Sequence, residues 1–435
     1  MAPKLTVEQP PRAASAASVK RRSMMASTVG NVLEWYEWSA YAVFTPFIAK
    51  ALFNTDDPVS ALLSTLAVFA VGFLMRPLGG IVFGRIADVK GRKFVLITTM
   101  LMMAGGSLLI GLMPTYGQVG VAASLLLLLA RVAQGFAHGG ESATANTYIA
   151  EIAPAQRRGQ WGSIVFVAIF GGSVLAYMLG GAVTNVLSAS AVAEWGWRIP
   201  FLFGAVLALS ALYMRRGMAE SEVFDGQQED QAVKTAPPLD RKKIIRSILM
   251  MIGMTAGITA AHYTWTSYAS TYAITRQGMD PQGAYWVTVF AQLIALVSLP
   301  FWGKLSDKIG RRPVLIGFAL AMIIAQIPLM SMINSQPWTL FVASTLALLI
   351  VGASGALLAS VLSEAFPTRV RTQGIGFAYS LSVALFGGTA PYLNALFNSW
   401  SLGWLSNIYI MILCALTGLV VYKLRETRGI DLKDA

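Results

Sequence analysis

Long apolar runs, separated by short polar and basic segments, make up most of the chain. The run at 94–113 has no charged residue, and about 20 apolar residues are what an α-helix needs to cross a bilayer. The fourth run is longer than that, so we expect its helix to continue into the cytoplasm. The pattern predicts an all-α membrane protein with twelve transmembrane helices, at 26–49, 60–84, 94–113, 118–150, 161–187, 197–215, 247–274, 284–303, 313–333, 338–363, 372–398 and 403–423.

Two of the polar segments between these runs occur twice. GRIADVKGRK at 84–93 returns as GKLSDKIGRR at 303–312, and EIAPAQRRG at 151–159 returns more loosely as EAFPTRVRTQG at 364–374. Each copy follows the same helix of a six-helix set, so the chain is predicted to contain two parallel six-helix bundles, a symmetry typical of transporters. The expected units are an N-terminal tail at 1–25, bundles at 26–216 and 247–423, a polar linker at 217–246, and a tail at 424–435.

The basic residues fix the expected orientation. If both termini lie in the cytoplasm, the inner tails and loops hold 28 of the 33 lysines and arginines. Lys50, Arg198 and Arg276 fall outside, whereas Arg76 and Arg131 fall within the membrane. This asymmetry follows the positive-inside rule. The net charge of +12 is therefore a topology signal and not a nucleic-acid site. We expect a multi-pass protein of the bacterial inner membrane.

Composition excludes an ordinary soluble enzyme, because only 12% of residues are charged whereas soluble domains carry about 25%. The single cysteine, Cys414, rules out disulfides and a cysteine-bound zinc site, and no cofactor is expected. Residues 1–23 are polar and are not followed by a cleavable signal sequence. A membrane enzyme or a receptor is the competing class, but the chain has no nucleotide loop, metal cluster or catalytic Ser/His arrangement.

Five stretches resemble the metabolite:proton symporter family of the major facilitator superfamily, and the likeness covers nearly the whole chain. They are GNVLEWYEW at 30–38, FLMRPLGG at 73–80, RVAQGFAHGGE at 131–141, EWGWRIPF at 194–201 and SDKIGRR at 306–312. Within this family the chain is most similar to the α-ketoglutarate permeases. It departs from the usual EWYDF at Glu37 and Trp38, and from the usual GGEYG at 139–143, which reads GGESA. The resemblance implies a carrier for a small molecule and protons, and we expect it to be a monomer.

Ionisable side chains inside a membrane are costly and commonly face a cavity or a partner. At 1.5 Å per residue, Glu37 lies ~16 Å above the inner end of its helix and Arg131 ~20 Å below the outer end of its own. Both are therefore near the midplane, where the carboxylate and the guanidinium could meet. The resemblance agrees, since proton-driven relatives use a helix-1 acid and a helix-4 arginine. Either proton coupling or a permanent structural ion pair fits.

Three other acidic and basic residues lie in the membrane. Arg76 and Glu141 share a depth nearer the inner face, which favours a structural gate pair. Glu34 lies one turn below Glu37 and is either a second proton site or a gate residue. The candidates for substrate binding are Arg131, Arg76, Glu141, Tyr36, His262, Tyr263, Trp265, Tyr268, Gln292, Tyr379 and Asn394. For the helix-7 aromatics among them, packing is the alternative to a binding wall.

The repeated inner loops are interpreted as gates, with simple anchoring by positive charge as the alternative. In the superfamily that the chain resembles, the first of these loops holds the two halves together on the inner side. The candidate gating residues are Gly84, Arg85, Asp88, Gly91, Arg92, Asp307, Gly310, Arg311, Glu151, Arg157, Glu364 and Arg371.

The sequence therefore predicts a proton symporter that imports a small organic acid, in particular a dicarboxylate such as α-ketoglutarate. The alternatives are a zwitterion (proline or betaine) and another carboxylate (citrate, shikimate or an aromatic acid). Osmosensing relatives carry a long coiled-coil tail, whereas only about a dozen residues follow Tyr422 here. The choice of a carboxylate rests mainly on resemblance, with the two arginines as partners for it.

Overall fold

The computed structural model describes residues 16–90, 92–139, 153–216, 241–364 and 371–430. Within these ranges only the backbone is described at 16–29, 84, 87–90, 92–93, 96, 211–216, 241, 243–244 and 371–374. The described residues form helices and contain no strand. Eight of the helices in these ranges are long and apolar enough to cross a membrane, and two further apolar helices, Ile97–Leu112 and Gly196–Ser210, are shorter.

One, two or three consecutive helices occupy each of the twelve predicted spans. The first six spans are α1 (Ala16–Leu52), α2 (Pro58–Leu74) with α3 (Arg76–Lys90), α4 (Arg92–Leu112), α5 (Tyr116–Val119) with α6 (Val121–His138), α8 (Arg158–Val186), and α10 (Ile199–Arg216). The last six are α13 (Arg241–Tyr263) with η4 (Thr264–Tyr268) and α14 (Ala269–Gln277), α15 (Pro281–Ile309), α16 (Arg311–Met332), α17 (Pro337–Gly355) with α18 (Leu358–Glu364), α19 (Arg371–Ser382) with η6 (Val383–Gly387) and α20 (Ala390–Ser399), and α21 (Gly403–Lys423).

The fold class is confirmed, and the helix ends show where the hydrophobic pattern falls short. Helix α1 begins at Ala16 and α15 ends at Ile309, so both pass the apolar boundaries expected at 26 and 303. Polar residues continue these helices because helix geometry does not depend on lipid contact. The seventh and eleventh spans each contain a π-helical turn, η4 and η6, which often marks a functional site.

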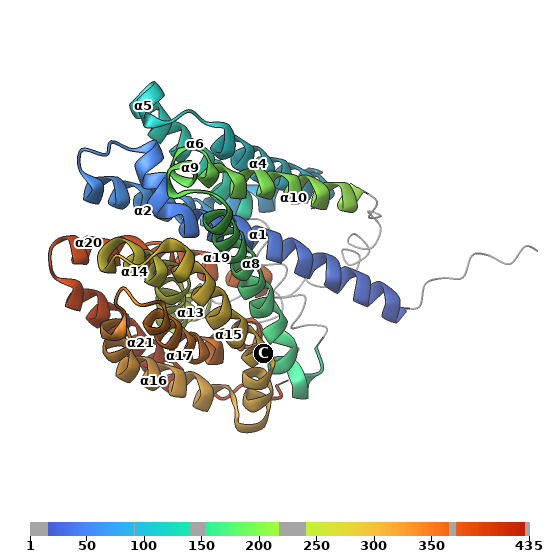
Figure 1. The fold of residues 1–435 in the computed structure, drawn as a ribbon. Coiled ribbons are helices and arrows are strands. Elements are labelled where there is room, and N and C mark those ends of the chain that lie inside the picture. Colours follow the sequence, from blue (N-terminus) through green and yellow to red (C-terminus); the bar gives the residue numbers. More distant parts are fainter. Residues whose placement is uncertain (1–15, 91, 140–152, 217–240, 365–370, 431–435) are drawn as a thin grey trace, which may run out of the picture.

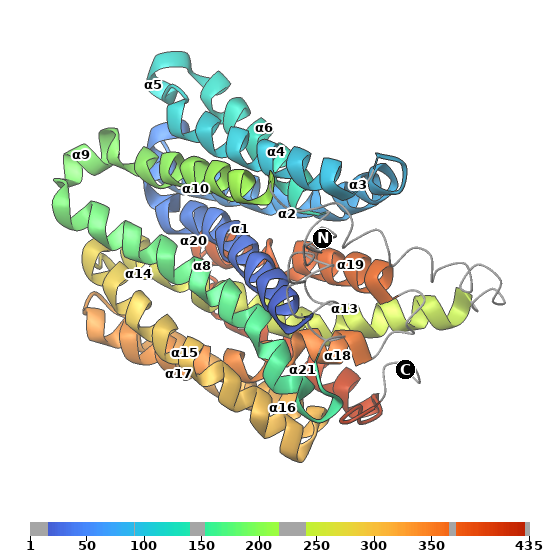
Figure 2. The same ribbon diagram turned by 90° about the vertical axis from the view of Figure 1, so that its right-hand side faces the viewer.

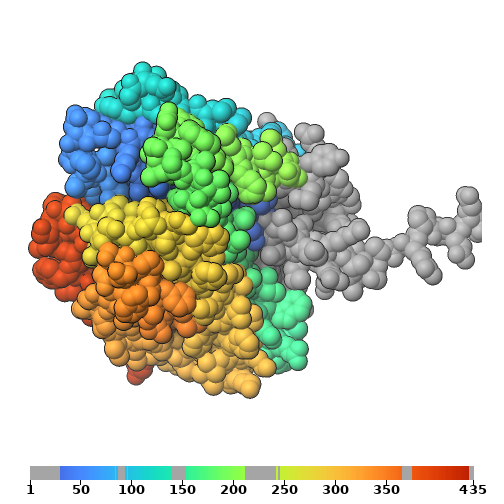
Figure 3. All heavy atoms as spheres, in the orientation of Figure 1, coloured from blue at the N-terminus to red at the C-terminus, as the bar shows by residue number. Residues whose placement is uncertain are grey.

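The two halves of the chain lie against each other along their length. Figures 1 and 2 show the blue-to-green half above the yellow-to-red half, and Figure 3 shows the two surfaces in contact. Helix α8 packs on α15 along the interface, α2 contacts α20, and α3 contacts α19. A single buried apolar cluster includes side chains from both halves. Residues at the interface between the halves are therefore largely buried.

Local signals in the sequence set several helix ends. Asp57 accepts hydrogen bonds from the N–H groups of Val59 and Ser60, and Pro58 opens α2. Asp280 and Pro281 begin α15 in the same way. Side-chain caps and an early proline satisfy or remove the free N–H groups of a first turn. These ends fix the lengths of the helices that face the partner half.

Glycines let α6 lie directly against the second helix of its half. A Cβ atom built on Gly135 would overlap the carbonyl oxygen of Gly72, and one on Gly139 would overlap that of Arg76. The backbones touch here, so no side chain fits between them. This close approach holds α6, which carries Arg131, against the helix that carries Arg76.

We expect Gly135→Ala to destabilise the folded protein by about 1–3 kcal/mol, because the added methyl group meets a backbone atom that cannot move aside. Gly105→Ala is the matched control, since a Cβ atom at Gly105 of α4 meets nothing within 4 Å. The melting temperature in detergent should fall for the first variant and stay or rise for the second. Equal melting temperatures would contradict the backbone contact.

Candidate functional site

A buried chain of polar side chains crosses the N-terminal half and is here called the polar relay (Glu37, Ser107, Gln134 and Arg131). The Ser107 hydroxyl of α4 donates to Oε2 of Glu37 on α1. Gln134 of α6 donates from Nε2 to Ser107 Oγ at 2.9 Å and accepts at Oε1 from Arg131 Nη1, also at 2.9 Å. All four side chains are at most 4% exposed. The relay joins a carboxylate and a guanidinium through two neutral groups.

Glu37 and Arg131, which were expected to be able to meet near the midplane, are connected through Ser107 and Gln134 in this conformation. Among the described residues, no ion pair joins these two side chains, although they interact electrostatically. Gln134 lies one turn from Arg131 on α6 and takes its Nη1 group. The guanidinium also stacks on the rings of Trp38 and Tyr41, at 4.0 and 4.4 Å from its carbon to their centroids. These contacts turn it away from the acid.

Arg76 begins α3 and is buried beside the same tryptophan. Its guanidinium carbon is 4.2 Å from the ring centroid of Trp38 and 3.8 Å from that of Phe73. It interacts electrostatically with Glu34, Tyr263 and Tyr379. Glu141, its expected partner, lies outside the described residues, so the predicted pair is not tested. Two buried arginines therefore flank the indole of Trp38.

His138 is a buried polar group that the sequence interpretation did not select. Its Nδ1 atom accepts a hydrogen bond from Nε1 of Trp38 at 3.1 Å and lies against Oε1 of Glu34. His138 stands seven residues after Arg131, two turns along α6, and therefore on nearly the same face. It belongs to the stretch RVAQGFAHGGE, and its position inside an apolar run was the available signal.

A small cavity lies between the halves, next to Trp38. Its volume of ≈ 10 Å³ gives room for about one water molecule. Helices α1, α2, α8 and α13, together with η4, line it. The lining residues are Trp35, Trp38, Ser39, Phe69, Ile169, Ser173, His262, Tyr263, Thr266 and Ser267. The space is too small for any molecule much larger than water.

The seventh span (α13, η4 and α14) divides its polar and aromatic residues between two faces. His262 and Tyr263 line the cavity, as expected for binding residues, but Trp265 and Tyr268 point into the C-terminal half. The indole N–H of Trp265 donates to Gln326, and the hydroxyl of Tyr268 accepts from Asn398. Only part of this candidate set therefore lies at the cavity, where Thr266 and Ser267 join His262 and Tyr263 from four positions further along the chain.

The other predicted substrate ligands lie away from the cavity. The Tyr36 hydroxyl donates to the carbonyl oxygen of Pro200, which makes it a contact between α1 and α10. Asn394 donates to Thr264. Gln292 is fully buried on α15, and its amide has no hydrogen-bond partner among the described residues. Tyr379 is buried on α19 and interacts electrostatically with Arg76.

A cluster of charged side chains, here called the inner network, joins the halves at the end of the bundle with the basic loops (Arg158, Asp307, Arg311 and Glu364). Glu364 accepts from Arg158 Nη1 at 3.1 Å and from two nitrogens of Arg311 at 3.1 and 3.3 Å. Arg311 also donates to Asp307 at 2.6 Å. Arg158 belongs to α8 and the other three to the C-terminal half, so the network spans the interface.

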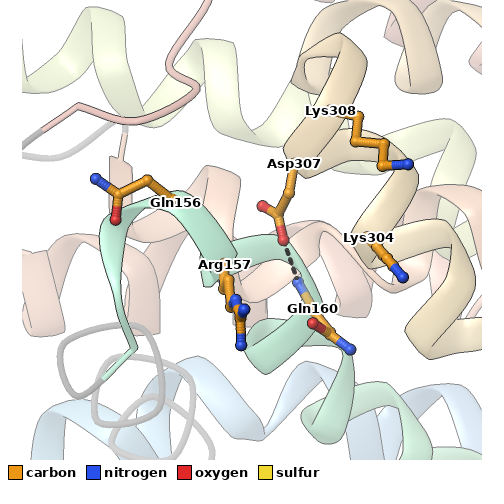
Figure 4. Close-up of a pocket in the computed structure, with 6 residues that line it drawn as sticks. All are labelled: Gln156, Arg157, Gln160, Lys304, Asp307 and Lys308. Atoms are coloured by element: carbon orange, nitrogen blue, oxygen red, sulfur yellow. Dashed lines mark hydrogen bonds between the residues drawn. The ribbon is translucent and has the colours of Figure 1, made fainter.

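Asp307 also binds the first turn of α8 across the same interface. Its two carboxylate oxygens accept from the backbone N–H groups of Gly159 and Gln160 at 2.8 and 2.9 Å. Figure 4 shows the contact with Gln160 at the edge of a groove of ≈ 360 Å³. The predicted gating residue Arg157 is exposed and lines this groove with Gln156, Gln160, Lys304, Asp307 and Lys308. A carboxylate thus caps a helix of the opposite half.

The segment after α21 adds a further carboxylate to this end. Gly310 has φ 106° and no side chain to cap α16, and Glu426 accepts instead from the N–H groups of Arg311 and Arg312 at 2.8 and 3.0 Å. Burial raises the pKa of Glu426, but these and two more backbone donors together lower it below its ordinary value. Thr427 donates to Glu364 at 2.6 Å. The sequence interpretation selected Arg157 from the repeated segment at 151–159 and missed its neighbour Arg158. It missed Glu426 because that residue belongs to no repeated motif.

The first copy of the repeated loop is not described in the same detail. Arg85 is exposed at the end of α3. Only the backbone is described at Gly84, Asp88, Arg92 and Arg371, and Gly91 and Glu151 lie outside the described residues entirely. Gating by the first loop therefore stays a prediction.

Comparison with known proteins gives a family match over most of the chain. A model of the Major Facilitator Superfamily matches residues 28–378 and 275–434. The alpha-ketoglutarate permease of Escherichia coli (strain K12) is 38% identical over 376 residues, which cover 85% of this chain and 86% of the permease. The ectoine/proline transporter ProP of Corynebacterium glutamicum is 35% identical, covering 94% of this chain and 84% of that protein. The citrate-proton symporter of Klebsiella pneumoniae is 34% identical, covering 94% and 92%.

A solved structure matches the whole fold. The crystal structure of a D-xylose-proton symporter superposes with a TM-score of 0.76, at 20% identity, covering 94% of this chain and 99% of that one. At this identity the likeness shows the fold alone.

Proposed function

The chain belongs to the major facilitator superfamily and is a membrane transporter, not an enzyme, and we propose that it imports a dicarboxylate such as α-ketoglutarate together with protons. It acts as a monomer in the bacterial inner membrane, with both termini in the cytoplasm, and moves its substrate by alternating access between the two halves. Glu37 carries the coupled proton, and Arg131 is its counter-charge.

The polar relay is the observation that supports proton coupling most directly. Glu37 is 4% exposed, and the only hydrogen bond given to its carboxylate among the described residues comes from the neutral Ser107 hydroxyl. A buried acid with one neutral partner changes its proton affinity strongly when a charge approaches or withdraws. If the Gln134 side chain rotated away, the Arg131 guanidinium could approach the Glu37 carboxylate and form an ion pair with it. Alternating access offers that rearrangement, because Arg131 at one end of the relay stacks on Trp38, which lines the cavity between the halves.

Two buried guanidinium groups support an anionic substrate. Nε and Nη2 of Arg76 and of Arg131 have no hydrogen-bond partner among the described residues. Both groups pack on Trp38, which lines the cavity. Unsatisfied buried donors are costly, and a carboxylate accepts two N–H groups of one arginine at once. A dicarboxylate has one such group for each arginine.

A zwitterion is the second candidate, and the aromatic lining of the cavity favours it. Trp35, Trp38, Phe69 and Tyr263 surround the space, and aromatic faces attract quaternary ammonium groups. The name of the ProP relative includes proline and ectoine. The arginines would then bind the carboxylate of the zwitterion while the rings bind its cationic end.

Uptake into vesicles of reconstituted protein separates these candidates. We expect labelled α-ketoglutarate to accumulate when the outside is more acidic, and a protonophore to abolish this. At 100 times its Kd a ligand stabilises the folded protein by about 2.7 kcal/mol, so α-ketoglutarate should also raise the melting temperature. Stabilisation and uptake with proline or betaine, but not with α-ketoglutarate, would overturn the dicarboxylate assignment. Uptake that is insensitive to the protonophore would overturn proton coupling.

A further inference from the structure

Glu34, His138 and Trp38 form a second buried polar cluster, separate from the polar relay. Trp38 Nε1 is 3.1 Å from His138 Nδ1, and Oε1 of Glu34 lies against the same Nδ1 atom. The His138 side chain is fully buried and that of Glu34 is 9% exposed. One imidazole nitrogen therefore faces both an indole N–H and a carboxyl oxygen.

The chemistry of imidazole limits where the protons of this cluster can be. A ring nitrogen either carries a hydrogen and donates, or has one lone pair and accepts. The indole nitrogen can only donate, so Nδ1 must be the acceptor while Trp38 keeps its hydrogen bond. The Glu34 oxygen can then approach Nδ1 only if it carries a proton, because an ionised carboxylate would oppose the lone pair.

Loss of that proton changes the partner of Trp38. An ionised Glu34 attracts a hydrogen onto Nδ1, which the imidazole supplies by changing tautomer or by taking up a proton. Nδ1 then donates to Glu34 and no longer accepts from the indole, so Trp38 loses its hydrogen bond to His138. The proton shared by Glu34 and His138 therefore determines whether the Trp38 indole keeps its hydrogen bond to His138.

We propose that Glu34 and His138 form a protonation switch that fixes or frees Trp38, and that this controls how far Arg76 and Arg131 are open to the central cavity. Trp38 lies over both guanidinium groups, at 4.2 and 4.0 Å, and lines the cavity. Movement of one indole thus changes the exposure of the two cations that the proposed function assigns to the substrate. His138 is a positioning residue in this scheme, since it acts through Trp38.

Other charged and titratable groups pack around the switch and must be separated from it in a test. Glu34 interacts electrostatically with Arg76 of α3, Tyr263 of α13 and Tyr379 of α19. Glu37 and Arg131 flank Trp38 along α1 and α6. The His138 nitrogen that holds the indole also contacts Glu34, so we expect substitution of Glu34 or of His138 to remove the pH dependence of the Trp38 hydrogen bond.

The test follows the indole N–H resonance of Trp38 by NMR in ¹⁵N-tryptophan-labelled protein, assigned by its absence in Trp38→Phe. In the unmodified chain we expect this resonance to shift with pH as the hydrogen bond is made and lost. In Glu34→Gln the side-chain amide donates to Nδ1 at every pH, and in His138→Gln the new side chain does not titrate. Both variants should give a resonance that no longer moves with pH, whereas in Glu37→Gln it should still move.

A Trp38 resonance that is constant with pH in the unmodified chain would overturn the proposal, and so would one that still titrates in either Glu34→Gln or His138→Gln. If one of these variants does not fold, the other decides. The measurement contains no substrate and no proton gradient. Failure of the switch therefore leaves the proposed transport function standing, and failure of transport leaves the switch standing.

Discussion

Glu364→Ala is expected to weaken the closure of the inner end by about 3–5 kcal/mol, because removal of one member of a buried ion pair leaves the others as uncompensated charges. Glu364 is buried, and so are the two arginines that donate to it. Arg158 belongs to the N-terminal half and Arg311 to the C-terminal half, so the carboxylate joins the halves. Its loss should shift the protein toward a form that is open at this end, or lower the melting temperature.

Cysteine labelling measures this opening. The chain has one cysteine, Cys414, which is buried and can be replaced by serine. Ser360→Cys then places a thiol at the interface, where Ser360 donates to the backbone carbonyl of Arg158. An impermeant maleimide added from the inner side should label this thiol faster in Glu364→Ala than in the same background with Glu364 intact.

Glu426→Gln is the matched control for this measurement. Glu426 lies at the same end and accepts from backbone groups of the C-terminal half only, so its loss should change labelling much less. Labelling at the same rate with and without Glu364 would contradict the role of the inner network in closure. Faster labelling from the outer side would contradict the orientation expected from the basic loops.

The sequence was sufficient for the fold because long apolar runs and the two repeated loops are strong signals that do not depend on side-chain contacts. Helix rise alone also brought Glu37 and Arg131 to the same depth. The polar relay could not be foreseen in this way. Its two middle members, Ser107 and Gln134, lie on different helices, and their meeting depends on how α4 and α6 are rotated about their axes.

The binding residues were harder to predict for a related reason. The hydrophobic pattern identifies the seventh membrane span, which contains α13 and η4. All residues from Tyr263 to Tyr268 are buried, so the pattern does not show which face of this span meets the cavity. The interruption by η4 adds to this, since a π-helical turn changes the rotation of every residue after it. His138 shows the opposite case, where a lone histidine in an apolar run was a visible signal.

Glu37→Gln is expected to abolish proton-driven accumulation and to leave exchange of internal for external substrate. A symporter must return empty without its proton, and coupling therefore needs a group whose proton affinity differs between the states of the cycle. Glutamine keeps the size of the side chain and can still accept from Ser107, but it permanently resembles the protonated acid. Exchange never uses the empty return, so it should continue.

Ser107→Ala distinguishes the acid from its hydrogen bond. This variant breaks the polar relay but keeps the Glu37 carboxylate, so we expect slower transport with accumulation preserved. If Ser107→Ala loses accumulation as completely as Glu37→Gln, the coupling would depend on the relay as a unit. Arg131 would then have to act on Glu37 through Gln134 and Ser107, and not by direct approach.

The most direct test of Glu37 compares the two modes of transport in the same vesicles. One pH unit corresponds to 1.36 kcal/mol, so a gradient of two units supports an accumulation of up to about 100-fold for each proton coupled. We predict that vesicles containing Glu37→Gln reach only equal concentrations of labelled substrate on both sides under this gradient, while preloaded vesicles still exchange. Accumulation above equality in the Gln variant would contradict the assignment of Glu37 as the coupling acid.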